Sequence, residues 1–410
     1  MTRKLSVLLF VCLGCGVLSL PFVWTKGFDN SVYQRPPPTA RDLRFHFEDT
    51  PLPQRLLFAR LQYFNCIDTR NGIEFALAMG VGNHRDWVFT GRSMVFAKIY
   101  FPDGGFEYRV TDYPGRNFSG SRLDSTSRVV NAAGQTMGEI VQQGEEVLQV
   151  RGHTGDGFFA WDVSYERARP AGPGCPPNAW TVWDRVPTRG IVPRAEVNYL
   201  AVMTRARVRG WLRAGDATYQ VEDGNGYADL YWGTPNFAAL TWTWIAYQGK
   251  QVDAHLYHNL NNNAGSLRVL VGGTTEMIFP RDSYTITFPP RDQWRLHQET
   301  GTLVPGEALI EAENPSFKAR ICWQARKVAF VLMDIPFLNF LIRDALTYEM
   351  ISDFQVQAWR KEPGGSQPVE LVSESGPGFS DWTRRLGWFE PHPARTDGYK
   401  TEGRSQAPQR

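Results

Sequence analysis

An acidic residue stands between two tyrosines at alternate positions of one segment: Tyr227, Asp229 and Tyr231. If this segment is a β-strand, successive side chains point to opposite faces, so these three share one face. A carboxyl walled by aromatic rings loses its water, which raises its pKa and can keep it protonated. A protonated carboxylic acid can donate to an alkene or enol carbon and start hydration or cyclisation. We therefore predict Asp229 and Tyr227 as catalytic residues, with Asp229 as the proton donor.

A structural role for the same residues is the alternative. Asp229 can accept backbone N–H bonds in a turn, and Trp232-Gly233 can close a hairpin. The preceding Asp223-Gly224-Asn225-Gly226 is predicted to be a turn, because glycine adopts positive φ and Asx side chains bond their own backbone. A hairpin from Ala206–Leu212, turning at Gly215-Asp216, is expected to lead into this segment.

A second aromatic segment follows, in which Trp242 and Trp244 share a face. Indole faces can wall a cavity for a conjugated or isoprenoid chain and stabilise a passing carbocation. We predict that these two residues bind substrate together with Tyr231, Trp232 and Tyr257. Ordinary core packing is the alternative for the tryptophans.

Other candidate groups are weaker. His255 and His258 lie three positions apart, so in a strand they face opposite sides and cannot easily share a metal ion. His153 lies in a loop before a strand and is a secondary acid–base candidate. The sequence has no nucleophile-elbow, Walker, zinc-protease or dinucleotide motif. We therefore predict no metal and no cofactor.

The sequence pattern indicates that these residues are positioned by many short strands. Gly72–Gly80 alternates, with its apolar side chains on one face, and Phe158–Tyr165 does the same. Leu56–Phe64 can be a short helix or an edge strand. The 65 Gly and Pro residues suit frequent turns, and the 14 Trp, 15 Tyr and 25 Phe favour strands. This pattern predicts an all-β fold of barrels or sandwiches.

The motif Gly-Tyr-x-Asp-x-x-Trp-Gly at 226–233, followed by Trp-x-Trp at 242–244, resembles the signature of the hydroxyneurosporene synthase (carotenoid 1,2-hydratase) and tocopherol cyclase-like superfamily. Certain fungal Diels-Alderases are distant members. The resemblance implies two lipocalin-like β-barrels around an apolar cavity, with a boundary just after Gly233. It assigns proton handling to Asp229 and Tyr227. The segment Tyr199–Met203 lacks the His and Trp of the hydratases, which disfavours carotenoid hydration itself. Tyr348-Glu349 is similar to a Tyr/Trp-Glu pair of the family.

The predicted organisation has five parts. A basic start at Arg3-Lys4 before an apolar run indicates a signal peptide or signal-anchor at 1–24. A Pro-rich linker follows at 25–40, then an N-terminal barrel at 41–234, a C-terminal barrel at 235–388 and a disordered tail at 389–410. We expect a protein of the secretory pathway, secreted or anchored, that contacts membrane only through its N-terminal segment.

Composition and modification motifs limit the partners. The net charge is +2, from 44 basic and 42 acidic residues, without a basic stripe, so nucleic-acid binding is not expected. Asn117-Phe118-Ser119 is a glycosylation motif. Cys66, Cys175 and Cys322 lie beyond the signal and can form one disulfide and leave one thiol.

These features favour a cofactor-independent cyclase, isomerase or hydratase that acts on an apolar isoprenoid, polyene or polyketide in a barrel cavity. The alternative is a secreted lipocalin-like carrier that binds the same molecules without chemistry. A structural or surface-interaction protein is the third interpretation.

Overall fold

The computed structural model describes residues 43–50, 58–82, 84, 91–168, 180–186, 195–233, 242–260, 265–298, 300–333, 345–362, 364, 367–385 and 399–401. The predicted signal or anchor and the predicted linker lie outside these ranges. Within them, no helix is long and apolar enough to cross a membrane.

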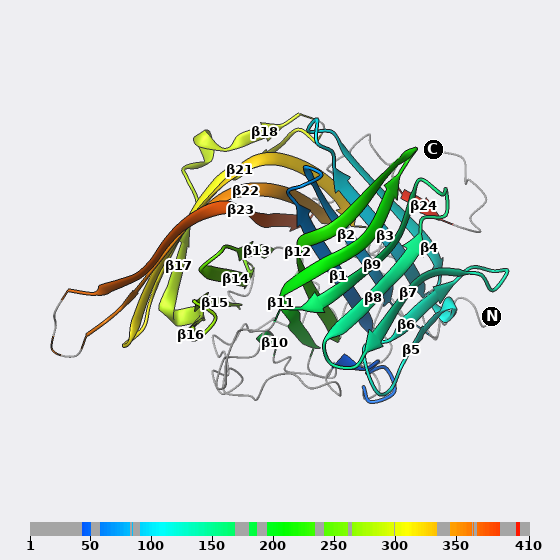
Figure 1. Ribbon diagram of the computed structural model, residues 1–410, viewed down its shortest axis with the longest axis horizontal. Helices are drawn as coiled ribbons and strands as arrows, with labels where there is room; N and C mark the ends of the chain where they lie inside the picture. Colours follow the sequence, from blue (N-terminus) through cyan, green and yellow to red (C-terminus); the bar gives the residue numbers. More distant parts are fainter. Residues whose placement is uncertain are drawn as a thin grey trace, which may run out of the picture.

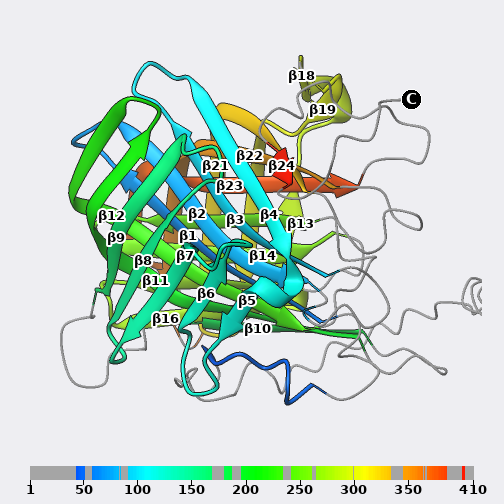
Figure 2. The same cartoon turned by 90° about the vertical axis from the view of Figure 1, so that its right-hand side faces the viewer.

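The fold is all-β, as predicted, with two large sheets that each curve into a nearly closed barrel (Figure 1). Barrel 1 is a sheet of 13 strands in the order β24-β4-β3-β2-β1-β12-β11-β9-β8-β7-β6-β5, with β10 paired to β11. Figure 2 shows these strands running obliquely side by side. Their bounds are β1 Ala59–Asp68, β2 Ile73–Gly82, β3 Arg92–Tyr100, β4 Phe106–Pro114, β5 Phe118–Gly120, β6 Ser127–Val130, β7 Thr136–Gln143, β8 Val147–His153, β9 Phe159–Arg167, β10 Trp180–Val186, β11 Ala195–Ala214, β12 Ala217–Gly233 and β24 Tyr399–Thr401.

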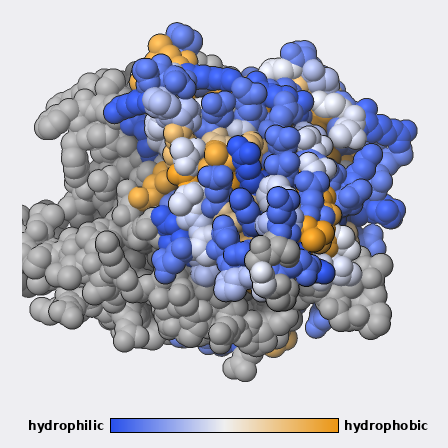
Figure 3. All heavy atoms as spheres, turned by 90° about the vertical axis from the view of Figure 1, so that its left-hand side faces the viewer, coloured by the Kyte–Doolittle hydropathy of each residue, from blue (hydrophilic) through white to orange (hydrophobic). Residues whose placement is uncertain are grey.

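Barrel 2 is a sheet of nine strands in the order β16-β15-β14-β13-β23-β22-β21-β20-β17. A separate hairpin of β18 and β19 lies beside it. The side of the molecule that carries barrel 2 is mainly hydrophilic, with a few apolar residues near its middle (Figure 3). The strand bounds are β13 Trp242–Gln248, β14 Val252–Asn259, β15 Gly265–Val271, β16 Thr275–Pro280, β17 Tyr284–Thr287, β18 Arg295–His297, β19 Thr302–Val304, β20 Glu307–Glu313, β21 Phe317–Met333, β22 Ala345–Arg360 and β23 Val369–Arg385; short 3₁₀ turns are η3 Gly115–Asn117, η5 Arg281–Ser283 and η6 Arg291–Gln293.

The two sheets divide the chain at the point where the sequence changes from β12 to β13. The predicted boundary after Gly233 falls between the end of β12 and the start of β13 at Trp242. One segment departs from the predicted organisation. Tyr399–Thr401, within the tail predicted to be disordered, forms β24 and pairs in parallel with β4.

Each barrel is filled by the apolar side chains that point inward from its strands. Ile73, Phe75, Leu77 and Met79 of β2 all lie in the core of barrel 1, as their alternation predicts. The alternatives for Leu56–Phe64 are both wrong for its described part, because β1 is an interior strand between β2 and β12. Its backbone is therefore hydrogen-bonded on both sides.

The hairpin of β11 and β12 carries the Asp229 segment, and its tip is where the sequence predicts it. Gly215 has φ of 59°, which suits the turn between the strands. The predicted turn at 223–226 is wrong, because these residues lie within β12. Gly224 and Gly226 provide room rather than a turn: a Cβ on Gly224 would overlap Cys66 Sγ, and one on Gly226 would overlap Val208 Cγ2.

Gly226→Ala is expected to destabilise the protein by about 1–3 kcal/mol. The added methyl would overlap Val208 and lie 2.9 Å from Tyr165 Cε1 and 3.0 Å from the carbonyl oxygen of Asn65. Urea unfolding would measure the loss. The exposed neighbour Asp223 gives the control, since Asp223→Ala should change the free energy of unfolding by less than about 1 kcal/mol. Equal effects of the two substitutions would contradict the packing explanation.

A third apolar cluster joins the barrels. It contains Tyr199, Ala201 and Tyr227 from barrel 1 and Trp244, Tyr257, Ile351 and Phe379 from barrel 2. On the same strands, the side chains that alternate with these point into the two barrel cores. The barrels therefore pack through the outer faces of their sheets.

Candidate functional site between the barrels

The predicted catalytic residues lie at this contact between the barrels. Tyr227 and Asp229 share one face of β12, as predicted, while Ala228 and Leu230 fill barrel 1. The sequence prediction placed the site in a barrel cavity. The described structure instead places these two side chains on the outer face of barrel 1, because the alternate positions of β12 supply its core.

A chain of hydrogen bonds holds the Asp229 carboxyl. Tyr199 donates its hydroxyl proton to Asp229 Oδ2 at 3.0 Å. Trp244 Nε1 in turn donates to the Tyr199 oxygen at 2.6 Å. The hydroxyls of Tyr199 and Tyr227 also bond one another. Because the Tyr199 proton goes to Asp229, Tyr227 is the donor in that last bond. Barrel 2 thus orients the acid of barrel 1 through Trp244.

The environment of Asp229 shifts its titration to neutral pH. Its side chain is buried, with 8% exposed. Burial raises the pKa of Asp229 to about 7; the hydrogen bond from Tyr199 and the nearby Tyr227 hydroxyl oppose this rise, and the charge of Glu349 adds to it. A carboxyl with this pKa populates both forms at neutral pH and can give or take a proton.

Barrel 2 contributes two more carboxyls in one row across its strands. Trp244 of β13 pairs with Asp381 of β23, and Asp381 pairs with Glu349 of β22. Directly paired residues share a face. Lys98 of barrel 1 forms a buried ion pair with Glu349, and the Tyr100 hydroxyl donates to the Glu349 carbonyl at 2.8 Å. The row therefore faces Asp229 and is tied to barrel 1.

Most of the predicted substrate-binding residues belong to this site. Trp242 donates from Nε1 to Asp381 Oδ2 at 3.3 Å, and Tyr257 stacks on Tyr199 with ring centroids 4.9 Å apart. Tyr231 is on the Asp229 face and is partly exposed. Trp232 is not part of the site, because it lies on the opposite face of β12 and stacks on His46.

Four residues of the site were not predicted from the sequence. These are Tyr63, Lys98, Tyr199 and Asp381, which come from strands far apart in the chain. Burial and the charges of Glu349, Asp381 and Asp229 raise the pKa of Tyr63, which places its hydroxyl within the influence of all three carboxyls. Isolated Lys or Asp residues in a strand carry no sequence signal for such a meeting. In the sequence, Glu349 was noted only as part of Tyr348-Glu349, which is similar to a Tyr/Trp-Glu pair of the family.

The two histidines of β14 face opposite sides, as predicted. His255 stacks on Tyr227 at the contact between the barrels, with ring centroids 5.4 Å apart. His258 points into barrel 2, where its Nδ1 lies 3.0 Å from the Tyr284 hydroxyl. Burial lowers the pKa of both imidazoles, that of His258 to about 3. In the described ranges, no group of three or more His, Cys, Asp or Glu side chains could hold a metal ion.

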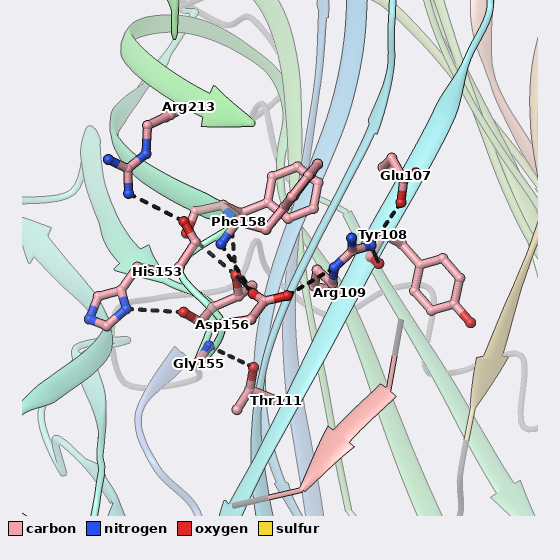
Figure 4. A network of polar contacts seen from close by, with 12 residues as sticks. Glu107, Tyr108, Arg109, Thr111, His153, Gly155, Asp156, Phe158 and Arg213 are labelled. Atoms are coloured by element: carbon pink, nitrogen blue, oxygen red, sulfur yellow. Dashed lines mark hydrogen bonds and ion pairs between the residues drawn. The ribbon is translucent and has the colours of Figure 1, made fainter. Parts of the chain in front are cut away.

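His153 is the last residue of β8 and not part of the loop that the sequence predicted, and the loop that follows it has a structural role. Asp156 lies within its polar network (Figure 4). It accepts hydrogen bonds from Thr154 Oγ1 at 2.7 Å and from Arg109 Nε at 3.0 Å. His153 Nδ1 lies 3.2 Å from the carbonyl oxygen of Thr154. The network ties the loop between β8 and β9 to β4, at a distance from Asp229 along the sheet.

The sequence predicts glycosylation of one asparagine and a disulfide among three cysteines. Two of the three cysteines lie in strands of the barrels, and the asparagine lies in a short 3₁₀ turn. Asn117 lies in η3, and its amide donates to the Val130 carbonyl at 2.8 Å. Cys66 is buried in barrel 1 and Cys322 lies in β21 of barrel 2, so these two are not bonded to each other. Cys175 lies outside the described residues. Glycosylation of Asn117 stays a prediction.

The pKa of Asp229 predicts how stability depends on pH. Below about pH 4 the residue is protonated in the folded and the unfolded chain. Between about pH 4 and pH 7 the unfolded chain releases this proton while the folded protein keeps it, so stability falls as pH rises. With the pKa raised from 3.8 to about 7, the full cost above pH 7 is about 4 kcal/mol.

Asp229→Asn removes this titration. The free energy of unfolding of the variant, relative to the wild type, should therefore increase by up to about 4 kcal/mol from pH 4 to pH 8. Urea unfolding of both proteins across this range would measure it. A difference that is constant with pH would show that Asp229 titrates normally.

Comparison with known proteins gives matches in fold only. No protein-family model and no curated protein matches the sequence. The chain is similar to the solved structure of a putative AttH from Nitrosomonas europaea, with a TM-score of 0.48 and 11% identity over 82% of this chain and 97% of that one. It is similar to kievitone hydratase from Nectria haematococca, with a TM-score of 0.46 and 10% identity over 87% and 95% of the two chains. It is also similar to CghA, with a TM-score of 0.45 and 9% identity over 82% and 90%.

The strand pairing and the apolar contact between the sheets define the class: a protein of two mainly antiparallel barrels that pack through their outer faces. One of these similar structures is that of a hydratase. At these values the likeness concerns the overall architecture.

Proposed function

We propose that the chain is a cofactor-independent cyclase, isomerase or hydratase, and that its reaction takes place between the barrels. The observation that supports this most is the buried Asp229, which is held by Tyr199 and Tyr227 and whose pKa is raised to about 7. Asp229 would transfer a proton at a carbon of the substrate: its protonated form can donate to an alkene or enol carbon, and its carboxylate can accept a proton. The aromatic rings of Trp242, Trp244 and Tyr257 favour an apolar isoprenoid, polyene or polyketide substrate.

Partly exposed side chains occur in the site beside the buried acid. Tyr63, Tyr231, Trp242 and Asp381 are partly exposed, whereas Asp229 is buried. A substrate that reaches these partly exposed side chains would meet the acid at the inner end of the site. This arrangement supports chemistry on an apolar molecule that is largely removed from water.

The test begins with the compound that the protein holds. Native protein, purified from a secreting host without its first 24 or so residues, would be extracted with organic solvent and analysed by mass spectrometry. An apolar compound in near-stoichiometric amount would support the proposal and provide the substrate or product for assays. A protein that holds nothing and takes up no carotenoid, prenyl quinol or polyene would contradict it.

A carrier of the same molecules is the second candidate. The absence of the hydratase His and Trp in Tyr199–Met203 favours it. A carrier would release the compound unchanged after incubation, and Asp229→Asn would not alter this result.

A further inference from the structure

The carboxyl of Asp381 has no role in the proposed proton transfer, although it lies in the same site. Its Oδ2 accepts one long hydrogen bond, from Trp242 Nε1 at 3.3 Å. Its Oδ1 is buried and has no hydrogen-bond partner among the described residues. A buried polar atom without a protein partner is costly, so Oδ1 is available to form a hydrogen bond with a bound molecule.

The surroundings of Asp381 favour its neutral form. Burial and the neighbouring charge of Glu349 raise the pKa of Asp381 well above its usual range. Asp229 adds to this rise, while the Trp242 N–H and Lys98 oppose it. A neutral Asp381 carries a proton that it can donate in a hydrogen bond, and its unpartnered oxygen Oδ1 is free to take part.

Asp381 and Asp229 approach one another from opposite barrels. Trp244 lies between them: it pairs with Asp381 across the strands and donates to Tyr199, which donates to Asp229. Tyr63 responds to the charges of both carboxyls. A small group of atoms bound beside Tyr63 would therefore meet an acid from each side.

Two further buried groups in the site are unpartnered. Asn65 and His255 are both 0% exposed, and none of their side-chain nitrogen and oxygen atoms has a hydrogen-bond partner among the described residues. Both flank Tyr227: Asn65 pairs with it across the strands, and His255 stacks on its ring. These groups give the contact between the barrels a polar character, which suits a ligand with polar atoms better than a pure hydrocarbon.

We propose that Asp381 donates a hydrogen bond to a carbonyl or enol oxygen of the substrate, which is therefore an apolar ketone or enone. This rests on the proposed function and names its substrate class. The Asp229 carboxylate removes a proton from the carbon beside the carbonyl; the C–H bond breaks and an O–H bond forms on Asp229. The electron pair moves to the carbonyl oxygen held by Asp381. Asp229 then returns the proton to another carbon of the conjugated chain, and the C=O bond is restored.

Binding of 2-naphthol, an aromatic mimic of the enol, tests the role of Asp381. Asp381→Ala and Asp381→Leu are expected to weaken its binding by about 10- to 100-fold, because each removes one strong hydrogen-bond donor. Leu keeps most of the side-chain volume, so it serves where Ala disturbs the fold. Asp353→Ala is the control, since this carboxyl is exposed on the neighbouring β22. Fluorescence titration and circular dichroism would give affinity and fold.

Unchanged affinity in a folded Asp381→Leu protein would overturn the proposal, as would a wild type that does not bind 2-naphthol. The proposed function fails separately, because its test is the conversion of the extracted compound by Asp229→Asn and not the affinity for 2-naphthol. Normal conversion of the extracted compound by Asp229→Asn would contradict the proposed function while leaving oxygen binding by Asp381 intact.

Discussion

Asp229→Asn is expected to lower conversion of the bound apolar compound by about 10²- to 10⁴-fold, which is the usual contribution of a positioned acid or base. The amide has nearly the same shape and can still accept the hydrogen bond that Tyr199 donates to Oδ2. It cannot give or take a proton at neutral pH. Binding of the compound should therefore persist while conversion is lost.

Deuterium uptake gives the clearest measurement. The extracted compound would be incubated with wild type and variant in D₂O, and incorporation of deuterium at carbon would be followed by mass spectrometry. Asp353→Asn, which changes an exposed carboxyl of barrel 2, is the matched control. Equal uptake with Asp229→Asn and wild type would favour the carrier. A variant that no longer folds would favour the structural interpretation of Asp229.

The local features of the fold could be predicted because side chains alternate between the two faces of a β-strand. The inward faces of β2 and β9 and the hairpin tip at Gly215 follow from periodicity and from the conformational freedom of glycine. The glycines at 224 and 226 misled the prediction, because glycine also occurs where another side chain needs space. Only the packing of Cys66 and Val208 against β12 distinguishes the two cases.

Only the part of the candidate site that lies on one strand could be predicted from the sequence. Tyr227 and Asp229 are close in sequence, so their shared face follows from one strand. Lys98, Glu349 and Asp381 come together only because the outer faces of two barrels meet, and no local pattern encodes that contact. The same reason explains why the site was expected inside a barrel. Alternation separates two faces of a strand, but it does not show which face a second domain covers.

The second prediction with a large expected effect concerns stability and rests on the ion pair of Lys98 and Glu349. The Lys98 side chain is 1% exposed and the Glu349 side chain 11% exposed. Lys98→Met should destabilise the protein by about 3–5 kcal/mol, because it leaves the Glu349 carboxylate buried and unpaired. The Tyr100 hydroxyl bonds only the backbone of Glu349 and cannot replace the lysine. Urea unfolding at pH 7, followed by tryptophan fluorescence, would measure the loss.

The double variant Lys98→Met/Glu349→Leu separates charge burial from packing. Removing both charges should restore much of the stability, because a buried ion pair and a well-packed apolar pair are often similar in free energy. Lys361→Ala is the control: its pair with Glu313 is exposed, so it should cost less than about 1 kcal/mol. If Lys98→Met cost no more than Lys361→Ala, the pair would contribute little to holding the barrels together. Since Glu349 also raises the pKa of Asp229, the double variant should lower that pKa, and the fall in stability from pH 4 to pH 8 should become shallower.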